Sequence, residues 1–317
     1  MGKWLSGENA PIIREVLHER ARPGEDAEYL GRRRPLSVAH QVNVSRALNS
    51  FSLDIVGPVV EDVHGGVVVY AGGDDALAML PVESVLPCLR DLRRLYGGLP
   101  LHDGSRAARA GFGSKRGHVS RGANLWRVMG ERATCSIGVA IAHQKWPLRH
   151  TLQTAREMER YAKSRLHRNA VAVALLKRSG GHEHFGVRWG DEHSVHDPDP
   201  LAVLEDVSAL ISSAGSREAR VSASTISRRF AYALGDEAPA LWPIKDALRD
   251  RAYWLLDRHW RKAVVQFRPA EARGVAEALH ALADQLEAQA GAEACGLFVA
   301  GLRLAEFIAR EGGGGAE

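Results

Sequence analysis

Apolar residues recur at helical spacing over 37–63, so this segment is predicted to form a long helix that bends or is interrupted at Gly57-Pro58. The spacing then changes to two short apolar runs within 67–80, one on each side of a glycine-rich turn. Such runs around a tight turn are typical of a β-hairpin. The amphipathic segment 82–96 that follows predicts a second helix.

Apolar and small residues alternate over 134–141, which predicts a strand. We expect its second face to lie very close to another element, because Ser136 and Gly138 leave room there. A helix at 147–166 is predicted next. Further strands are predicted at 170–176 and 185–189, and helices near 200–213, 222–235, 242–263, 270–289 and 292–311.

Residues 98–133 interrupt this order with a stretch rich in glycine, serine and arginine. We interpret it as a mobile basic insertion. Its side chains could contact an RNA backbone, because phosphate neutralisation needs only Lys and Arg, and a merely solvated insertion is the alternative. The basic residues are Arg106, Arg109, Lys115, Arg116, Arg121, Arg127 and Arg132, against the acids Asp103 and Glu131.

The order of elements predicts an α+β fold in which helices cover a sheet, followed by an all-helical C-terminal domain. The Asp-Pro repeat at 197–200 is a linker signal, so we place the boundary beside it. Residues 1–195 then form the first domain, with the basic insertion at about 98–133, and residues 196–317 form the second.

Composition narrows the class of protein. The 317 residues are 45% hydrophobic and 25% charged, a balance that excludes a disordered or collagen-like chain. No apolar run is long enough to span a bilayer and no apolar leader opens the sequence, so a cytoplasmic protein is expected. The formal net charge of +4 permits an anionic partner. The cysteines Cys88, Cys135 and Cys295 are too far apart for a CxxC zinc site or a disulfide framework.

The strongest candidate for chemistry is Gly72-Gly73-Asp74-Asp75, in the turn of the predicted hairpin. Neighbouring carboxylates converge only where the backbone turns sharply, and two glycines allow such a turn. Converging carboxylates repel each other unless a cation lies between them, and Mg²⁺ prefers such hard oxygen ligands. An ordinary hairpin turn is the alternative, because Gly and Asp are common in turns.

Three motifs carry a resemblance to a known family: MGKWLSG at 1–7, YAGGDD at 70–75 followed by LAMLP, and ATCSIG at 133–138. A helix with Glu159 and Ala162-Lys163 follows them. In this order they resemble the GGDEF nucleotidyl-cyclase palm. They are still more similar to the large polymerase-like subunit of type III CRISPR effector complexes in its Cmr (III-B) form. The resemblance covers about 1–190, and the helical remainder matches in kind and position only.

The resemblance implies a GGDEF/ferredoxin-like palm and an antiviral, Mg²⁺- or Mn²⁺-dependent nucleotidyltransferase that makes cyclic oligoadenylate from ATP when target RNA binds. Asp74 and Asp75 would be the catalytic, metal-binding carboxylates. Gly72 and Gly73 would let the backbone approach the nucleotide. The implied partners are the other subunits of the complex, guide and target RNA, and ATP, with no membrane.

Two further nucleotide-binding residues follow from the same resemblance. Lys163 matches a lysine that neutralises the triphosphate, and its alternative is a solvated helix residue paired with Glu159. His40 is expected near the nucleotide, because its helix packs beside the hairpin in this fold. The HD dipeptides His102-Asp103 and His196-Asp197 lie in loops and do not indicate a nuclease.

This chain begins at the MGKW match, so the family's HD domain and first palm strand, with its metal-binding aspartate, are expected to be missing. We therefore expect an exposed sheet edge and weak Mg-ATP binding by the chain alone. A catalytically impaired scaffold that contacts RNA is the main alternative function. A GGDEF-like diguanylate cyclase is less favoured, because the motif is GGDD and the C-terminal region is helical.

Overall fold

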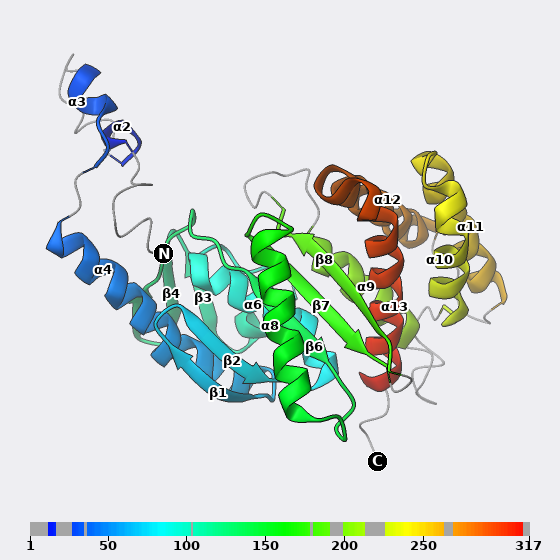
Figure 1. The fold of residues 1–317 in the computed structure, drawn as a ribbon, viewed down its shortest axis with the longest axis horizontal. Helices are drawn as coiled ribbons and strands as arrows, with labels where there is room; N and C mark the ends of the chain where they lie inside the picture. Colours follow the sequence, from blue (N-terminus) through cyan, green and yellow to red (C-terminus); the bar gives the residue numbers. More distant parts are fainter. Residues whose placement is uncertain are drawn as a thin grey trace.

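The structure is a computed structural model that describes residues 12–16, 27–34, 37–102, 104–177, 180–190, 199–212, 226–262 and 269–312. Two short helices, α2 (Ile13–Val16) and α3 (Ala27–Gly31), stand apart from the rest near the start of the chain (Figure 1). The sheet formed within residues 137–188 is covered by α8 (Leu148–Ser164) on one side and by the C-terminal helices on the other (Figure 1).

The predicted long helix is present as one helical segment: α4 (Val38–Asn49), η2 (Ser50–Ile55), α5 (Val56–Pro58) and η3 (Val59–Val63). The backbone stays helical through Gly57 and Pro58, so an interruption there is wrong, while the alternative, a bend at these residues, stays a prediction. Wider π-helical turns flank them on either side. Such turns shift the pattern of backbone hydrogen bonds around Pro58, which has no N–H to donate.

The predicted hairpin is confirmed as β1 (Val67–Gly72) and β2 (Asp75–Met79), an antiparallel pair. Its inner face packs Val68, Ala71 and Ala78 against Val56 and Val60 of the long helical segment and against Cys88. Cys88 belongs to α6 (Val85–Gly97), which follows the short η4 (Val82–Ser84). One face of the hairpin thus packs on both the long helical segment and α6, and the other face is exposed.

The segment 98–133 is folded, so the expectation of a mobile insertion is wrong. It contains α7 (Arg106–Arg109) and a three-stranded antiparallel sheet of β3 (Phe112–Lys115), β4 (His118–Arg121) and β5 (Asn124–Arg127). The physical reason is a small core of its own, in which the apolar residues of this segment pack on the long helical segment and α6. The buried members are Ile55, Val59, Leu95, Ala107, Phe112, Val119 and Val128.

The third sheet holds β6 (Ile137–Ile141), β7 (Ala170–Leu176) and β8 (His182–Arg188), in that order. β6 is parallel to β7, and β7 is antiparallel to β8. The crossover helix α8 (Leu148–Ser164) lies on β6 and β7. Within the described ranges no strand pairs with the other edge of β6, because the hairpin forms a separate sheet.

The C-terminal region is helical, as predicted: α9 (Pro200–Ser212), α10 (Arg229–Leu241), α11 (Lys245–Lys262), α12 (Pro269–Ala290), η6 (Gly291–Glu293) and α13 (Ala294–Gly312). The first four residues of the helix predicted at 222–235, and the boundary predicted at 195–196, lie outside the described residues. No helix of the described part of the chain is both long and apolar enough to cross a membrane.

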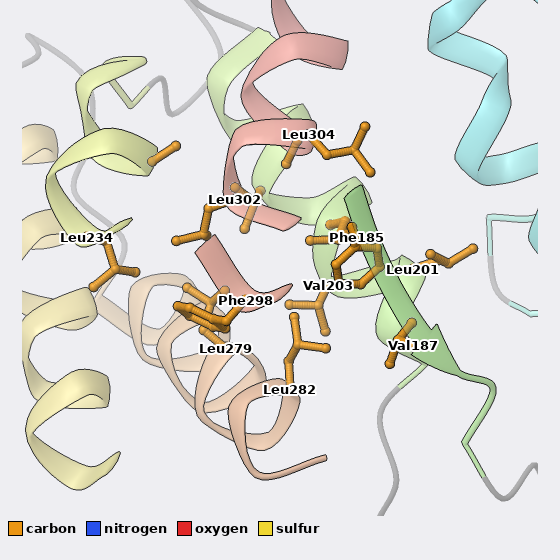
Figure 2. Packing of buried hydrophobic residues seen from close by; sticks show 14 of the residues in the cluster. Phe185, Val187, Leu201, Val203, Leu234, Leu279, Leu282, Phe298, Leu302 and Leu304 are labelled. Atoms are coloured by element: carbon orange, nitrogen blue, oxygen red, sulfur yellow. The ribbon is translucent and has the colours of Figure 1, made fainter. Parts of the chain in front are cut away.

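The helices share one core with the sheet. Alternate residues of β7 divide between the two faces: alanines face α8, while Val171, Val173 and Leu175 join the cluster of the C-terminal helices. Figure 2 shows Phe185 and Val187 of β8 beside Leu201 and Val203 of α9. The all-helical region therefore has no separate core, and packs as the second covering layer of the sheet.

An ion-pair cluster joins α6 to the start of α9. The Arg90 Nε donates a 2.7 Å hydrogen bond to Oδ2 of Asp199, and its Nη1 contacts Oε2 of Glu205. Burial raises the pKa of Glu205 and outweighs the opposing effect of the Arg90 charge. The cluster fixes the C-terminal helices to the helix that supports the hairpin.

Candidate functional site

The Gly-Gly-Asp-Asp motif forms the tight turn that its sequence predicts. Gly72 pairs with Asp75 across the hairpin, which leaves Gly73 and Asp74 as a two-residue turn. Gly73 has a φ of +60°, a backbone conformation that glycine adopts without steric cost. The second aspartate is thus the first residue of β2, and the two carboxylates are brought to the tip of the hairpin.

A serine from the long helical segment holds this tip. The Ser52 Oγ lies 2.8 Å from the carbonyl oxygen of Gly73 and 2.9 Å from that of Leu48. Because a hydroxyl has one proton, it can donate fully to only one of these carbonyls at a time. Ser52 is buried, so the turn is fixed to the helix by a contact that excludes water.

The side chains at the tip are open to solvent. Asp74 and Asp75 are both exposed. A Cβ atom at Gly72 would lie 2.8 Å from the Oη of Tyr70, so the phenol ring folds over this glycine. A side chain at position 72 would therefore displace the ring, which is itself 57% exposed. Gly73, where a Cβ atom would meet nothing within 4 Å, is the open part of the turn.

One group that sequence reasoning missed, Tyr96, senses the charge of the tip. The pKa of Tyr96 is raised to about 12, first by burial and then by the nearby Cys135 thiol and Asp74 carboxylate. The Tyr96 ring meets Phe51 edge-on, with ring centroids 5.1 Å apart. Tyr96 thus packs α6 against the long helical segment that carries Ser52. A lone tyrosine on an amphipathic helix gives no sequence signal of this role.

The close approach predicted at β6 is confirmed at Gly138. A Cβ atom there would lie 2.1 Å from the backbone nitrogen of Glu159 and 2.3 Å from the carbonyl oxygen of Ala155. Both atoms belong to the backbone of α8, so the helix rests directly on the strand. This contact places the second half of α8, including Lys163, over the start of β6.

The structure does not bring all predicted site residues together. The Lys163 ammonium contacts the Glu159 carboxylate, which is the i, i+4 pairing that was the alternative for this residue. Among the described residues, no other carboxylate lies within ion-pair distance of Lys163. His40 lies in the first turn of α4, roughly 18 Å along the helix axis from Ser52. Both remain predicted nucleotide-binding residues.

The donor set at the tip matches one way in which proteins hold Mg²⁺. Mg²⁺ is often bound by one or two carboxylates, with water and substrate phosphates completing the octahedron. Asp74 and Asp75 supply two such carboxylates and are exposed enough to admit a phosphate. Within the described part of the chain, no third His, Cys, Asp or Glu joins a group that could hold a metal ion by itself. The residues therefore fit Mg²⁺ carried with a nucleotide, and not a metal cage.

A buried polar cluster lies behind the site, and sequence reasoning missed it. The Asp91 carboxylate of α6 is fully buried and accepts hydrogen bonds from Nε2 of His64 at 3.1 Å, Oγ of Ser105 at 2.7 Å and the backbone N–H of Ala107 at 3.0 Å. The His102 Nε2 lies 3.4 Å from it. Burial acts to raise the pKa of Asp91, but these donors together hold it well below its usual range.

This cluster also accounts for one of the HD dipeptides, because His102 takes part in it as a structural partner. Asp103 and the dipeptide at 196–197 lie outside the described residues. The cluster connects the end of the long helical segment, α6 and α7, so it anchors the folded insertion to the helix that carries Tyr96.

A hairpin with two carboxylates at its tip, a parallel β6–β7 pair and a crossover helix packed on it define a palm of the nucleotidyl-cyclase class. The family model for Cas10/Cmr2, second palm domain, matches residues 1–172, more than half of the chain. The chain belongs to this family.

Two curated relatives agree with the family. A CRISPR system Cmr subunit Cmr2 of Pyrococcus furiosus is 31% identical over 193 residues, which are 60% of this chain and 19% of that protein. A Cmr2 subunit of Saccharolobus solfataricus is 45% identical over 65 residues, 19% of this chain and 6% of that protein. The chain thus spans about a fifth of the length of the first relative.

Proposed function

We propose that the chain is the palm part of a type III CRISPR complex of the Cmr form, and that it joins ATP molecules into cyclic oligoadenylate when target RNA is bound. The observation that carries this proposal is the exposed Asp74-Asp75 pair at a hairpin tip that Ser52 holds in place. The family supports it as well. Guide RNA, target RNA, ATP and the other subunits of the complex are the proposed partners.

The side chains present would bind and orient the nucleotide. Asp74 and Asp75 would hold Mg²⁺, which when bound neutralises the triphosphate and the charge that develops during phosphoryl transfer. The Gly72-Gly73 backbone would admit the phosphates. Ser52 would keep the tip in one geometry, so that the carboxylates need no rearrangement before the reaction. Lys163 would have to exchange its contact with Glu159 for the triphosphate.

A non-catalytic scaffold is the second candidate function. One observation favours it: in the residues that the structure describes, only two carboxylates gather at the tip and no third metal-ligating group joins them. A scaffold would retain the fold and its contacts to RNA and neighbouring subunits, but would not bind Mg-ATP through Asp74 and Asp75.

Mg²⁺-dependent ATP binding separates these two functions. We expect the full chain to bind a fluorescent ATP analogue weakly, and only with Mg²⁺ present. The double substitution Asp74→Asn with Asp75→Asn should weaken this binding at least roughly tenfold, because even the loss of an outer-shell partner costs a metal site about that much. Fluorescence titration with and without Mg²⁺ measures the effect.

The matched control is Asp54→Asn, which removes an exposed carboxylate on the same helical segment that carries Ser52. This variant should bind the analogue as the unaltered chain does. Binding that is independent of Mg²⁺, or equal in the double variant, would favour the scaffold.

A further inference from the structure

The sheet formed by β3, β4 and β5 has one face in the core and one face turned outward. In an antiparallel sheet, residues directly opposite each other point to the same face. Val119 pairs with Ser114 and with Trp126, and Phe112 lies two residues before Ser114. Phe112, Val119 and Trp126 pack in the core around Ile55. The alternate positions of all three strands therefore make up the outward face.

The outward face carries a row of basic residues. Lys115 pairs with His118, and His118 pairs with Arg127, so each strand contributes one side chain to the row. All three residues are exposed. Because neighbouring strands are about 4.8 Å apart, the row is about 10 Å long.

A second row runs beside the first on the same face. It consists of Gly113, Ser120 and Leu125, again with one residue from each strand. A Cβ atom at Gly113 would lie 2.6 Å from the Oγ of Ser120, so only a small residue fits there. Leu125 is 70% exposed and offers an apolar contact beside the basic row. The small side chains of this second row leave the face open beside the basic row.

Among the described residues, no carboxylate pairs with the cations of this face. Residues 104–130 include six Lys or Arg and no Asp or Glu. Arg121, on the inward face, pairs with Asp62 at 3.4 Å. In the part of the chain with described coordinates, no carboxylate lies within ion-pair distance of Lys115, Arg116 or Arg127.

The ring of His118 is held by a hydrogen bond to the backbone of Arg116. Its Nδ1 lies 3.0 Å from the carbonyl oxygen of Arg116, which can only accept, so Nδ1 must be the donor. In the neutral ring Nε2 is then an acceptor, and it donates to a phosphate oxygen only when the ring carries a second proton. The positive region continues toward α4, where burial and then the charges of Arg34 and Arg127 lower the pKa of His40.

The basic turn between β3 and β4 is held firmly. The N–H of Gly117 donates a 3.1 Å hydrogen bond to the carbonyl of Gly98, at the end of α6. The N–H of Val128 donates to the carbonyl of Gly117 at 3.0 Å. The backbone that carries the cations is thus fixed before any ligand binds, which lowers the entropic cost of binding.

We propose that the outward face of β3–β5 binds the phosphodiester backbone of single-stranded RNA, with Lys115 and Arg127 on the phosphates and Leu125 against a base. A protein interface of this size would bury more apolar surface than one leucine, whereas a strand of phosphates matches the exposed Lys115 and Arg127, which make no ion pair with the residues that the structure describes. The choice of RNA among polyanions rests on the proposed function.

Fluorescence anisotropy tests this inference with the full chain and a labelled oligouridine of roughly 15 nucleotides, over a series of salt concentrations. The double substitution Lys115→Ala with Arg127→Ala should lower the affinity at least roughly tenfold. It should also reduce the slope of log affinity against log salt by about 1.4, or about 0.7 for each lost phosphate contact.

The matched control is Arg156→Ala with Arg160→Ala, which removes the same charge from the exposed side of α8. It should leave affinity and slope unchanged. An equal loss in both double variants would show that only the overall charge matters, and no loss in the first would remove this face from RNA binding. Polyaspartate that binds the chain and loses affinity with Lys115→Ala and Arg127→Ala, while oligouridine does not, would assign the face to an acidic protein instead.

This test and the test of ATP binding can fail independently. Asp74→Asn with Asp75→Asn should retain full RNA affinity, because these carboxylates lie outside the β3–β5 sheet. If ATP binding proves absent while RNA binding depends on Lys115 and Arg127, only the proposed synthesis is rejected. If the reverse holds, only the RNA surface is rejected.

Discussion

Gly138→Ala is expected to lower the free energy of unfolding by about 3 kcal/mol, near the upper end of the range for overpacked sites. The added Cβ would lie 2.1 Å from the Glu159 nitrogen and 2.3 Å from the Ala155 carbonyl oxygen. Neither atom can rotate away, because both belong to the backbone of α8. The helix must therefore move off β6, and denaturation in guanidinium chloride, followed by circular dichroism, measures the loss.

Gly274→Ala is the matched control for this substitution. Gly274 is an exposed residue of α12, and a Cβ atom there would meet nothing within 4 Å. Since alanine favours the helix over glycine, this variant should gain up to roughly 1 kcal/mol. Similar stability of the two variants would contradict the direct contact between α8 and β6.

Asp91→Asn is expected to cost about 3 kcal/mol of stability at neutral pH, as is usual when one partner of a buried charged cluster is removed. The carboxylate accepts hydrogen bonds from the His64 ring, the Ser105 hydroxyl and the Ala107 N–H. An amide replaces one acceptor oxygen with two donors, which would face donors already present. Thermal and denaturant unfolding at pH 7 measure the change.

The pH dependence of this loss gives a second readout. The pKa of Asp91 is lowered in the folded protein, so its contribution is present above the unfolded pKa of about 3.9 and is lost as the pH falls below it. The difference in stability between the unaltered chain and Asp91→Asn should therefore shrink in acid.

Asp62→Asn is the control, because the carboxylate of Asp62 is 61% exposed and its pairing with Arg121 is at the surface. It should change stability very little at any of these pH values. A loss as large as that of Asp91→Asn, or a loss in Asp91→Asn that does not change with pH, would contradict the buried cluster.

The features that the sequence predicted well depend on residues that are close to each other in the sequence. The hairpin tip follows from two glycines and two aspartates in a row, and the close packing of α8 on β6 follows from a small residue at Gly138. The same local reasoning failed for 98–133. There the strands are only four residues long, and most of the apolar residues that cover them, such as Ile55 and Leu95, come from other parts of the chain. The segment itself is therefore rich in glycine and arginine and shows no clear strand pattern.

The supports of the site could not be predicted, because they join residues that are distant in sequence. Ser52 and Gly73 are 21 residues apart, and Arg90 and Asp199 are 109 apart. A serine within a helix and an arginine on an amphipathic helix are ordinary in sequence terms. Likewise, the apolar helices beyond residue 200 carry no sign that they would share a core with Val171 and Phe185.

The most direct test of the central claim is product analysis with the chain assembled in its own complex. The complex is isolated by a tag on this chain, and is given labelled ATP, Mg²⁺ and a complementary target RNA. Labelled oligoadenylate and pyrophosphate should form, and neither should form when the complex carries Asp74→Asn with Asp75→Asn, although its composition and RNA binding are unchanged. Equal product from the complex with both substitutions would contradict the account, because the hairpin tip would then take no part in the reaction.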